Sequence, residues 1–456
     1  MSSLSHELAA HVDRVSFDDF DEAVLDITSD LLLDTVGCSI GAFTSPPSKA
    51  LRAEYGDHRG TAGATVVGTD VDVPVETAGL INGTMARYLD YNDCYMATGG
   101  ACHPSDHIMP LLSVAQSEGA TGRDLAEAIV VAYEVECSGL DQATVRERGF
   151  DYAAWGPYSS AAAVGKLMGL SRDELVDAFG IAGASNAPLY ITRRGDVSMW
   201  KGLAHPYVTH NAIQACQMAR AGITGPTEVF EGDYGFQAVV SDNDLDFSER
   251  PTGDEYRILE TGIKYFATGY YIHSPLTGAL ELVDEHDIAP DDIDAIHVDI
   301  FETAAKALAT PEKWGTDQTR ETADHSIPYS VAVGIVDGEV TPRQFEPDRL
   351  RGPDVHAVME KITVSEDPDL TEYRRDHPRH IPSVTTITVD GTEYRSRVDA
   401  PLGHAERPMS DEQLDGKFRA LCDGLLADEQ MERVMALSAD LPDLDTVDPL
   451  LDALVV

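Results

Sequence analysis

A run of alternating residues, Val384-Thr-Thr-Ile-Thr-Val389, is followed by Asp390-Gly391 and then by Thr392-Glu-Tyr-Arg-Ser-Arg-Val398. Residues of high strand propensity stand on both sides of the Asp-Gly pair, which suits the type I′ turn that joins two antiparallel strands. The stretch therefore predicts a β-hairpin. Because a hairpin is rarely stable alone, it also predicts further strands and covering helices nearby.

Those further elements are visible upstream of the hairpin. Ile296, Val298 and Ile300 alternate with polar residues, and Ile362-Thr-Val364 is a second strand signal. Helical patterns lie between them, at residues 276–286 and 327–336. This part of the chain is predicted to form an α/β domain.

The two ends of the chain are predicted to be helical. Capping boxes begin helices at Ser171-Arg-Asp-Glu174 and Ser410-Asp-Glu-Gln413, and Thr121-Gly-Arg-Asp124 is a close relative of that motif. The run 160–168 is rich in small residues, which suits a closely packed helix. A chain of 456 residues exceeds the roughly 250–300 residues that one core supports. The expected architecture is mainly α with an inserted α+β lid: a large all-helical domain from 1–264 and 403–456, and a smaller α/β domain from 265–402.

The formal net charge is −46, from 79 acidic and 33 basic residues. The acids are spread along the whole chain, which favours the hydrated surface of a salt-adapted protein over an acidic binding tail. At molar salt the Debye length falls to about 3 Å, so self-repulsion is screened. Nucleic-acid binding is not expected, because no basic face is visible. No membrane span and no secretory signal are apparent, so we expect a cytoplasmic protein.

Three polar clusters are candidates for chemistry. The densest contains Asp90, Asp93 and Cys94, followed by His103, and these groups could supply a general acid and a general base. A metal site there is the rival interpretation, but the spacing fits no standard ligand set. A helix-capping loop would use the same residue types, so the residues alone leave these possibilities open.

Lysine is scarce in this chain, and two lysines lie among apolar residues. They are Lys201, in Ser198-Met-Trp-Lys-Gly202, and Lys264, in Ile263-Lys-Tyr-Phe266. Such lysines could bind a carboxylate, although the residues alone favour a snorkelling or salt-bridged structural lysine at each position. The third cluster is Asp324-His-Ser-Ile-Pro-Tyr329, where Asp324 could orient His325 and Tyr329 could donate a proton. No nucleotide-binding glycine motif and no G-x-S-x-G elbow is present.

Taken in order, these motifs resemble the MmgE/PrpD family, which includes 2-methylcitrate dehydratase, cis-aconitate decarboxylase and an iminodisuccinate epimerase. The likeness runs nearly from end to end. It is carried by Leu33-Asp-Thr-Val-Gly37, Leu89-Asp-Tyr-Asn-Asp93, His103-Pro-Ser105, Arg148-Gly-Phe-Asp151, Ser198–Gly202, Thr224-Gly-Pro226, Lys264-Tyr-Phe266, Asp324–Tyr329 and Lys417-Phe418. Tyr152 departs from the pattern, since many members carry histidine there.

The resemblance implies a site, a reaction and a quaternary state. It assigns catalytic positions to Asp90, His103, Lys201, Lys264 and Tyr329, and places Asp93, Cys94, His273 and His325 in substrate binding or support. It implies no metal and no organic cofactor, a small polycarboxylate substrate and a homodimer.

The expected activity is that of a hydro-lyase that dehydrates 2-methylcitrate or a related tri- or dicarboxylate to the corresponding aconitate. In that reading Lys201 and Lys264 bind carboxylates, Asp90 and His103 are candidates for proton transfer, and Tyr329 donates to the departing hydroxyl. Decarboxylation of cis-aconitate, epimerisation of an amino-dicarboxylate, and a non-catalytic acidic binding protein on the same fold are the alternatives.

Overall fold

The computed structural model describes residues 3–56, 63–98, 100–194, 197–241, 243–248 and 253–456. The chain divides into two compact units. Unit 1 contains Met1–Thr261 and Ser410–Val456, and unit 2 contains Gly262–Met409. The two ends of the chain thus belong to one unit, and the segment between them forms the other.

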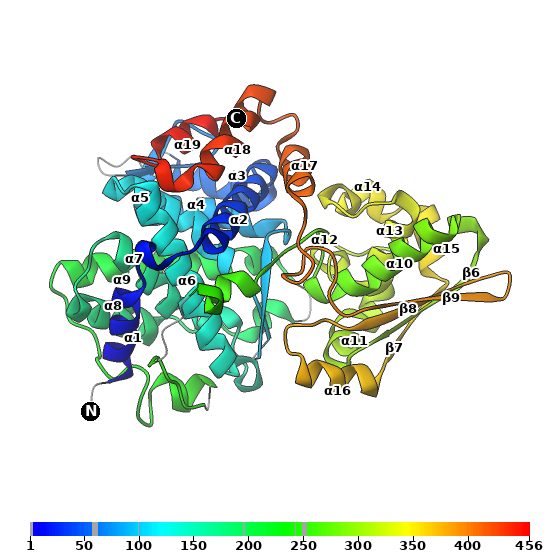
Figure 1. The fold of residues 1–456 in the computed structure, drawn as a ribbon, viewed down its shortest axis with the longest axis horizontal. Helices are drawn as coiled ribbons and strands as arrows, with labels where there is room; N and C mark the ends of the chain where they lie inside the picture. Colours follow the sequence, from blue (N-terminus) through cyan, green and yellow to red (C-terminus); the bar gives the residue numbers. More distant parts are fainter. Residues whose placement is uncertain (1–2, 57–62, 99, 195–196, 242, 249–252) are drawn as a thin grey trace. The chain divides into compact units, whose positions relative to one another are not determined.

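Unit 1 is built mainly from helices (Figure 1). Those of the N-terminal segment are α1 (Leu4–Arg14), α2 (Glu22–Gly41), α3 (Pro46–Tyr55), α4 (Val75–Tyr88), α5 (Ile108–Glu118), α6 (Gly122–Gln142), α7 (Gly156–Leu167), α8 (Arg172–Ser185) and α9 (Ala204–Arg220). Those of the C-terminal segment are α17 (Asp411–Cys422), α18 (Asp428–Ala439) and α19 (Asp448–Ala453).

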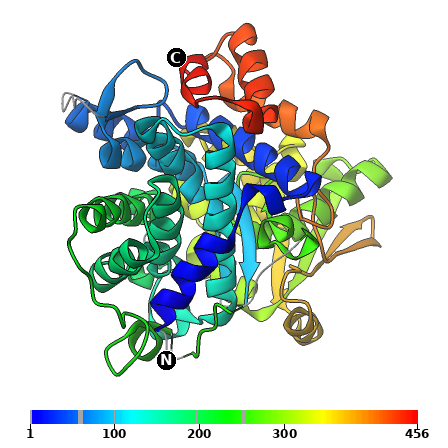
Figure 2. The same ribbon diagram turned by 60° about the vertical axis from the view of Figure 1, so that its left-hand side comes forward.

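The core of unit 1 surrounds α7, which packs against α6, α8 and α9. Ala161, Ala162 and Ala163 are fully buried in α7, so the small side chains allow neighbouring helices to approach closely. The C-terminal helices α17 and α18 pack on α2, and the orange and red C-terminal segment lies beside blue helices in Figure 1 and Figure 2. The predicted capping boxes at Thr121, Ser171 and Ser410 are all present.

The expectation of an all-helical domain is wrong in one respect. Unit 1 also contains short strands: β1 (Gly63–Thr65) pairs with β2 (Asp72–Pro74), and β3 (Asp93–Ala97) pairs with β4 (Gly100–Cys102). All five residues of β3 are buried, so their sequence lacks the alternation that reveals a half-exposed strand. The second hairpin matters for function because it carries Asp93 and Cys94 and leads directly into His103.

Unit 2 contains a four-stranded sheet in the order β7-β6-β8-β9. Its strands are β6 (Ile293–Ile300), β7 (Ile362–Glu366), β8 (Ser383–Val389) and β9 (Thr392–Val398), and the short β5 (Gly262–Ile263) precedes them. The pairs β6–β8 and β8–β9 are antiparallel, whereas β6–β7 is parallel. The predicted hairpin is confirmed, with Val389 opposite Thr392 and both turn residues, Asp390 and Gly391, at positive φ.

Helices α10 and α13 lie along this sheet (Figure 1). The helices of unit 2 are α10 (His273–His286), α11 (Glu302–Leu308), α12 (Arg320–Ala323), α13 (Ile327–Asp337), α14 (Pro347–Leu350), α15 (Pro353–Met359) and α16 (Pro368–Asp376). Pro328 stands in the first turn of α13, where its missing N–H costs nothing, and Ser326 caps that turn by accepting from the Tyr329 N–H. Among the described residues, no helix combines the length and the apolarity that crossing a membrane requires.

Candidate functional site

Asp90 follows the end of α4 in a backbone conformation that few residues adopt. Its φ is +53°, in the left-handed region that is uncommon for any residue with a side chain. Two cations hold its carboxylate: Arg87 Nη1 lies 2.5 Å from Oδ1, and Lys201 Nζ lies 3.0 Å from Oδ2. Asp90 and Lys201 are therefore brought together in unit 1, and two cations hold the carboxylate in place.

Arg87 is the residue that sequence reasoning missed. It is 2 % exposed, and its Nε lies 3.6 Å from Asp106 Oδ1, so it stands between two buried acids. Burial opposes its charge, but Asp90, Tyr152 and Asp106 together outweigh this and hold the pKa of Arg87 above its usual range. A charged residue within the otherwise apolar and small pattern of α4 was the available signal.

His103 has a defined tautomer in this arrangement. Its Nδ1 lies 2.7 Å from the backbone oxygen of Asp93, which can only accept, so Nδ1 carries a hydrogen and, in the neutral imidazole, Nε2 carries the lone pair. The side chain is 8 % exposed, which leaves a small part of it accessible. His103 is thus arranged as an acceptor of protons through Nε2.

Asp93 supports His103 from strand β3. Its carboxylate accepts from the Ser105 hydroxyl at 2.6 Å and from the Tyr133 hydroxyl at 2.7 Å, and the Ser105 N–H approaches it at 3.2 Å. Burial nevertheless raises the pKa of Asp93 to about 7, because these hydrogen bonds replace only part of the lost solvation. Cys94, the next residue, is buried with its Sγ 3.9 Å from the Tyr95 carbonyl oxygen.

Tyr152 and Lys417 complete the surroundings of this region, which spans Arg87 to His107. The Tyr152 hydroxyl donates to Asp106 Oδ2 at 2.6 Å, and its ring meets His103 edge-on with centroids 5.7 Å apart. Lys417 donates to the Tyr91 carbonyl at 2.7 Å and pairs with Asp34 at 2.6 Å. Lys417 therefore ties α17 to the segment that carries Asp90.

Unit 2 holds the remaining predicted residues. Lys264 is fully buried directly after β5, and His273 is fully buried at the start of α10, with its ring 5.3 Å from that of Phe266. His325 Nδ1 lies 2.5 Å from Asp324 Oδ1, and the imidazole lies against Gly269, where a Cβ would come within 3.1 Å of the ring. His325 is thus oriented by the acid that precedes it, as expected.

Tyr329 is buried in α13. Its hydroxyl donates to the Gln344 carbonyl at 2.6 Å, and burial raises its pKa above the ordinary value. The phenolic proton is therefore held by the backbone of unit 2.

Both parts of the chain match models of one protein family. The MmgE/PrpD N-terminal domain matches residues 6–248, and the MmgE/PrpD C-terminal domain matches residues 266–441. The chain is 29 % identical to the 2-methylcitrate dehydratase of Cupriavidus necator over 441 residues, which cover 91 % of this chain and 89 % of the relative.

Two further relatives match over similar spans. The 2-methylcitrate dehydratase of Salmonella typhimurium is 27 % identical over 430 residues, covering 90 % of this chain and 88 % of the relative. A cis-aconitate decarboxylase-like protein of Aspergillus oryzae is 24 % identical over 475 residues, covering 97 % and 96 %. With both family domains matched over most of its length, and with the motifs in their expected order, the chain belongs to the MmgE/PrpD family.

Proposed function

We propose that this protein is a hydro-lyase that dehydrates 2-methylcitrate, or a closely related tri- or dicarboxylate, to the corresponding aconitate. The observation that carries the proposal is the Nδ1 bond of His103 to the Asp93 carbonyl, which leaves Nε2 as the ring nitrogen that can accept a proton when the imidazole is neutral. The names of the curated relatives support the choice of substrate.

The reaction breaks a C–H bond beside a carboxylate and a C–O bond at the neighbouring carbon, forms the C=C bond and releases water. We assign removal of the proton to His103 Nε2. Asp90 is a weaker base, because Arg87 and Lys201 stabilise its charge, and we assign it the positioning of Lys201. Lys201 and Lys264 are assigned to carboxylate binding, where fixed cations stabilise the charge that develops in the transition state.

The family resemblance makes Tyr329 the donor to the departing hydroxyl, with His273 and His325 in support. The Tyr329 hydroxyl now donates to Gln344. That role therefore requires this bond to open during turnover.

The test is a product assay in molar KCl. Purified protein is given 2-methylcitrate, citrate, cis-aconitate and iminodisuccinate in parallel, and products are separated by chromatography. We expect an aconitate from 2-methylcitrate, and a loss of about 10²–10⁴-fold in kcat for His103→Gln. His210→Gln, on α9 with its Nδ1 bonded to the Glu76 carbonyl, is the matched control and should keep full activity.

The same assay separates the alternatives. Carbon dioxide from cis-aconitate would favour decarboxylation, for which the Aspergillus oryzae relative is the supporting observation. An epimer without an alkene would favour epimerisation. If no substrate reacts and His103→Gln changes nothing, the dehydratase proposal is wrong and a binding role on the same fold is favoured.

We further propose that the protein is salt-adapted, cytoplasmic and independent of a dissociable cofactor. The net charge of −46 supports salt adaptation, because so much negative charge repels itself when it is unscreened. Unfolding followed by circular dichroism should show loss of structure below about 0.1 M salt, where the Debye length exceeds about 10 Å. Full stability without salt would contradict salt adaptation. Loss of activity in EDTA without loss of fold would contradict cofactor independence.

We also propose that the protein is a homodimer. An apolar surface on unit 1 supports this: Ile191 is 71 % exposed, Leu189 57 %, Met199 49 % and Trp200 44 %. Exposed large apolar side chains in so acidic a chain are typical of contact surfaces. Sedimentation in molar KCl should give a dimer that Trp200→Asp dissociates, while Tyr234→Asp, at an exposed aromatic residue elsewhere, leaves it intact.

A further inference from the structure

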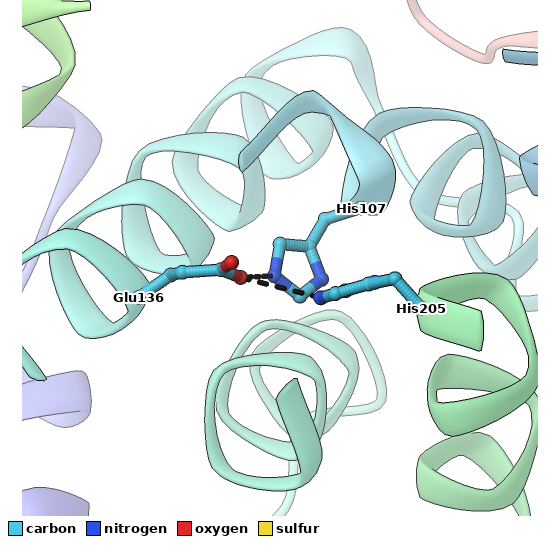
Figure 3. A group of neighbouring side chains, drawn as sticks. All are labelled: His107, Glu136 and His205. Atoms are coloured by element: carbon cyan, nitrogen blue, oxygen red, sulfur yellow. Dashed lines mark hydrogen bonds and ion pairs between the residues drawn. The ribbon is translucent and has the colours of Figure 1, made fainter. Parts of the chain in front are cut away.

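Three side chains from separate parts of unit 1 meet in its interior. They are His107, at the end of a short turn (Pro104–His107), Glu136 of α6 and His205 of α9 (Figure 3). All three side chains are fully buried. The Nε2 atoms of both histidines face the same carboxylate oxygen, Glu136 Oε2, at 2.5 Å for His107 and 3.4 Å for His205.

The other ring nitrogens of both histidines are held by hydroxyl groups. His107 Nδ1 lies 3.2 Å from Ser160 Oγ, and His205 Nδ1 lies 3.4 Å from Thr209 Oγ1. A hydroxyl oxygen can accept from an imidazole N–H, so these contacts permit the tautomer in which Nδ1 carries the hydrogen. Both Nε2 atoms can then present lone pairs to a common centre. This is the pattern of supporting hydrogen bonds around histidines that bind a metal.

The carboxylate of Glu136 is unevenly satisfied. The Ser159 hydroxyl donates to Oε2 at 3.2 Å, so three groups converge on that oxygen. Glu136 Oε1 is buried and has no hydrogen-bond partner among the described residues. His205 Nε2 also has no hydrogen-bond partner among them. A buried charged oxygen without a donor costs free energy. One cation at the centre would satisfy both atoms.

We propose that His107, Glu136 and His205 bind one Zn²⁺ ion through the two Nε2 atoms and the Glu136 carboxylate. Two imidazoles and a carboxylate suit this borderline-soft cation. Ligands on one zinc ion lie about 3 Å apart, so His107 and Glu136 must separate by roughly half an ångström on binding.

The ion would stiffen the interior next to His103 without touching substrate. The Tyr152 ring stacks on His205 with centroids 5.9 Å apart, and the same ring meets His103 edge-on. The site is thus a support for the region that carries His103, and the elimination itself has no step at the metal.

The experiment measures metal in the full-length chain in molar KCl, without reference to activity. The protein is refolded with Zn²⁺ or Co²⁺, passed over a desalting column and analysed by elemental mass spectrometry and X-ray absorption. We expect one metal per chain with nitrogen and oxygen neighbours at about 2.0–2.2 Å.

Variants locate the ion. His205→Gln and Glu136→Gln should each weaken Zn²⁺ binding by more than the 10–100-fold that loss of a supporting group causes, and Ser160→Ala should fall within that range. His210→Gln, on the same helix but outside the cluster, should bind normally. Less than a tenth of an ion in the unmodified protein would overturn the proposal. Sulfur neighbours at about 2.3 Å, which would place the metal on cysteines, would also overturn it.

Discussion

Buried ion pairs in unit 1 differ from exposed ion pairs in unit 2. In unit 1, the side chains of Arg87 and Asp90 are each 2 % exposed, and those of Lys417 and Asp34 are 4 % and 1 % exposed. In unit 2, Arg349 pairs with Asp354 at 24 % and 52 % exposure, and Arg407 pairs with Glu281 at 45 % and 42 %. Salt screens exposed pairs far more than buried ones. At molar salt, the ion pairs that still contribute are therefore those beneath the candidate site of unit 1.

The largest loss of unfolding free energy is expected for Arg87→Met. This change leaves Asp90 and Asp106 buried without their shared cation, which typically costs about 3–5 kcal/mol. Denaturant unfolding in molar KCl measures the loss. Arg123→Met removes the exposed pair with Asp18 in the same unit and should cost less than about 1 kcal/mol. Equal losses of unfolding free energy in the two variants would show that buried and exposed ion pairs do not differ in their contribution to stability.

The second prediction concerns how the free energy of unfolding depends on pH. It rests on Glu134 of α6, a buried acid of unit 1. Burial raises its pKa to about 8 from the ordinary 4.5. Between these values the folded chain keeps a proton that the unfolded chain releases, so the free energy of unfolding falls as pH rises from about 5 to 8. One such group contributes up to about 1.4 kcal/mol per pH unit.

Glu134→Gln should flatten that pH dependence. Part of the slope should remain, because Asp93 is shifted in the same direction. Glu393→Gln, at an exposed position of β9, should leave the slope as it is. An unfolding free energy that rises from pH 5 to 8 would contradict the assigned direction.

A third and smaller effect tests the buried hydroxyl of unit 2. Tyr329→Phe removes the bond to the Gln344 carbonyl, which should cost about 1–3 kcal/mol of stability. If Tyr329 also donates the proton to the leaving hydroxyl, kcat should fall by about 10²–10⁴-fold. Tyr373→Phe, which loses a partly buried bond to His380, is the control for stability alone. Unchanged kcat would remove Tyr329 from the reaction.

The smallest effect is expected for Arg349→Met in unit 2. Its pairs with Asp337 and Asp354 are partly exposed, so the loss at low salt should be about 0–1 kcal/mol. Because these pairs are screened, the loss should vanish in molar KCl. Unfolding curves at several salt concentrations give the answer, and a loss that persists at molar salt would show that exposed pairs of unit 2 resist screening.

Local signals were sufficient for much of the fold. The Asp390-Gly391 hairpin and the capping boxes at Ser171 and Ser410 depend on neighbouring residues, and the structure reproduces each of them. The β3–β4 hairpin was missed, because a strand buried on both faces reads as an apolar run without alternation.

The contacts within the candidate site were harder to predict from the sequence. The Asp90 motif was visible and Arg87 stands only three residues before it, but Lys201 becomes its partner through packing, since Lys201 lies 111 residues away. The His107, Glu136 and His205 cluster is formed in the same way, by residues from three separate segments. The sequence contains their identities, whereas their meeting depends on how α6 and α9 pack around α7.

Because of Lys417, folding of the segment that carries Asp90 depends on the order in which the chain is synthesised. The ammonium group that binds the Tyr91 carbonyl lies 326 residues later in the chain. At roughly 5–20 residues per second, tens of seconds pass before that lysine leaves the ribosome. During that time the segment that carries Asp90 has emerged while Asp34 still lacks this partner. A chain truncated before α17 should therefore accumulate as an incompletely folded species. The packing of α17, which brings Lys417 to Tyr91 and Asp34, is then a late step in the assembly of unit 1.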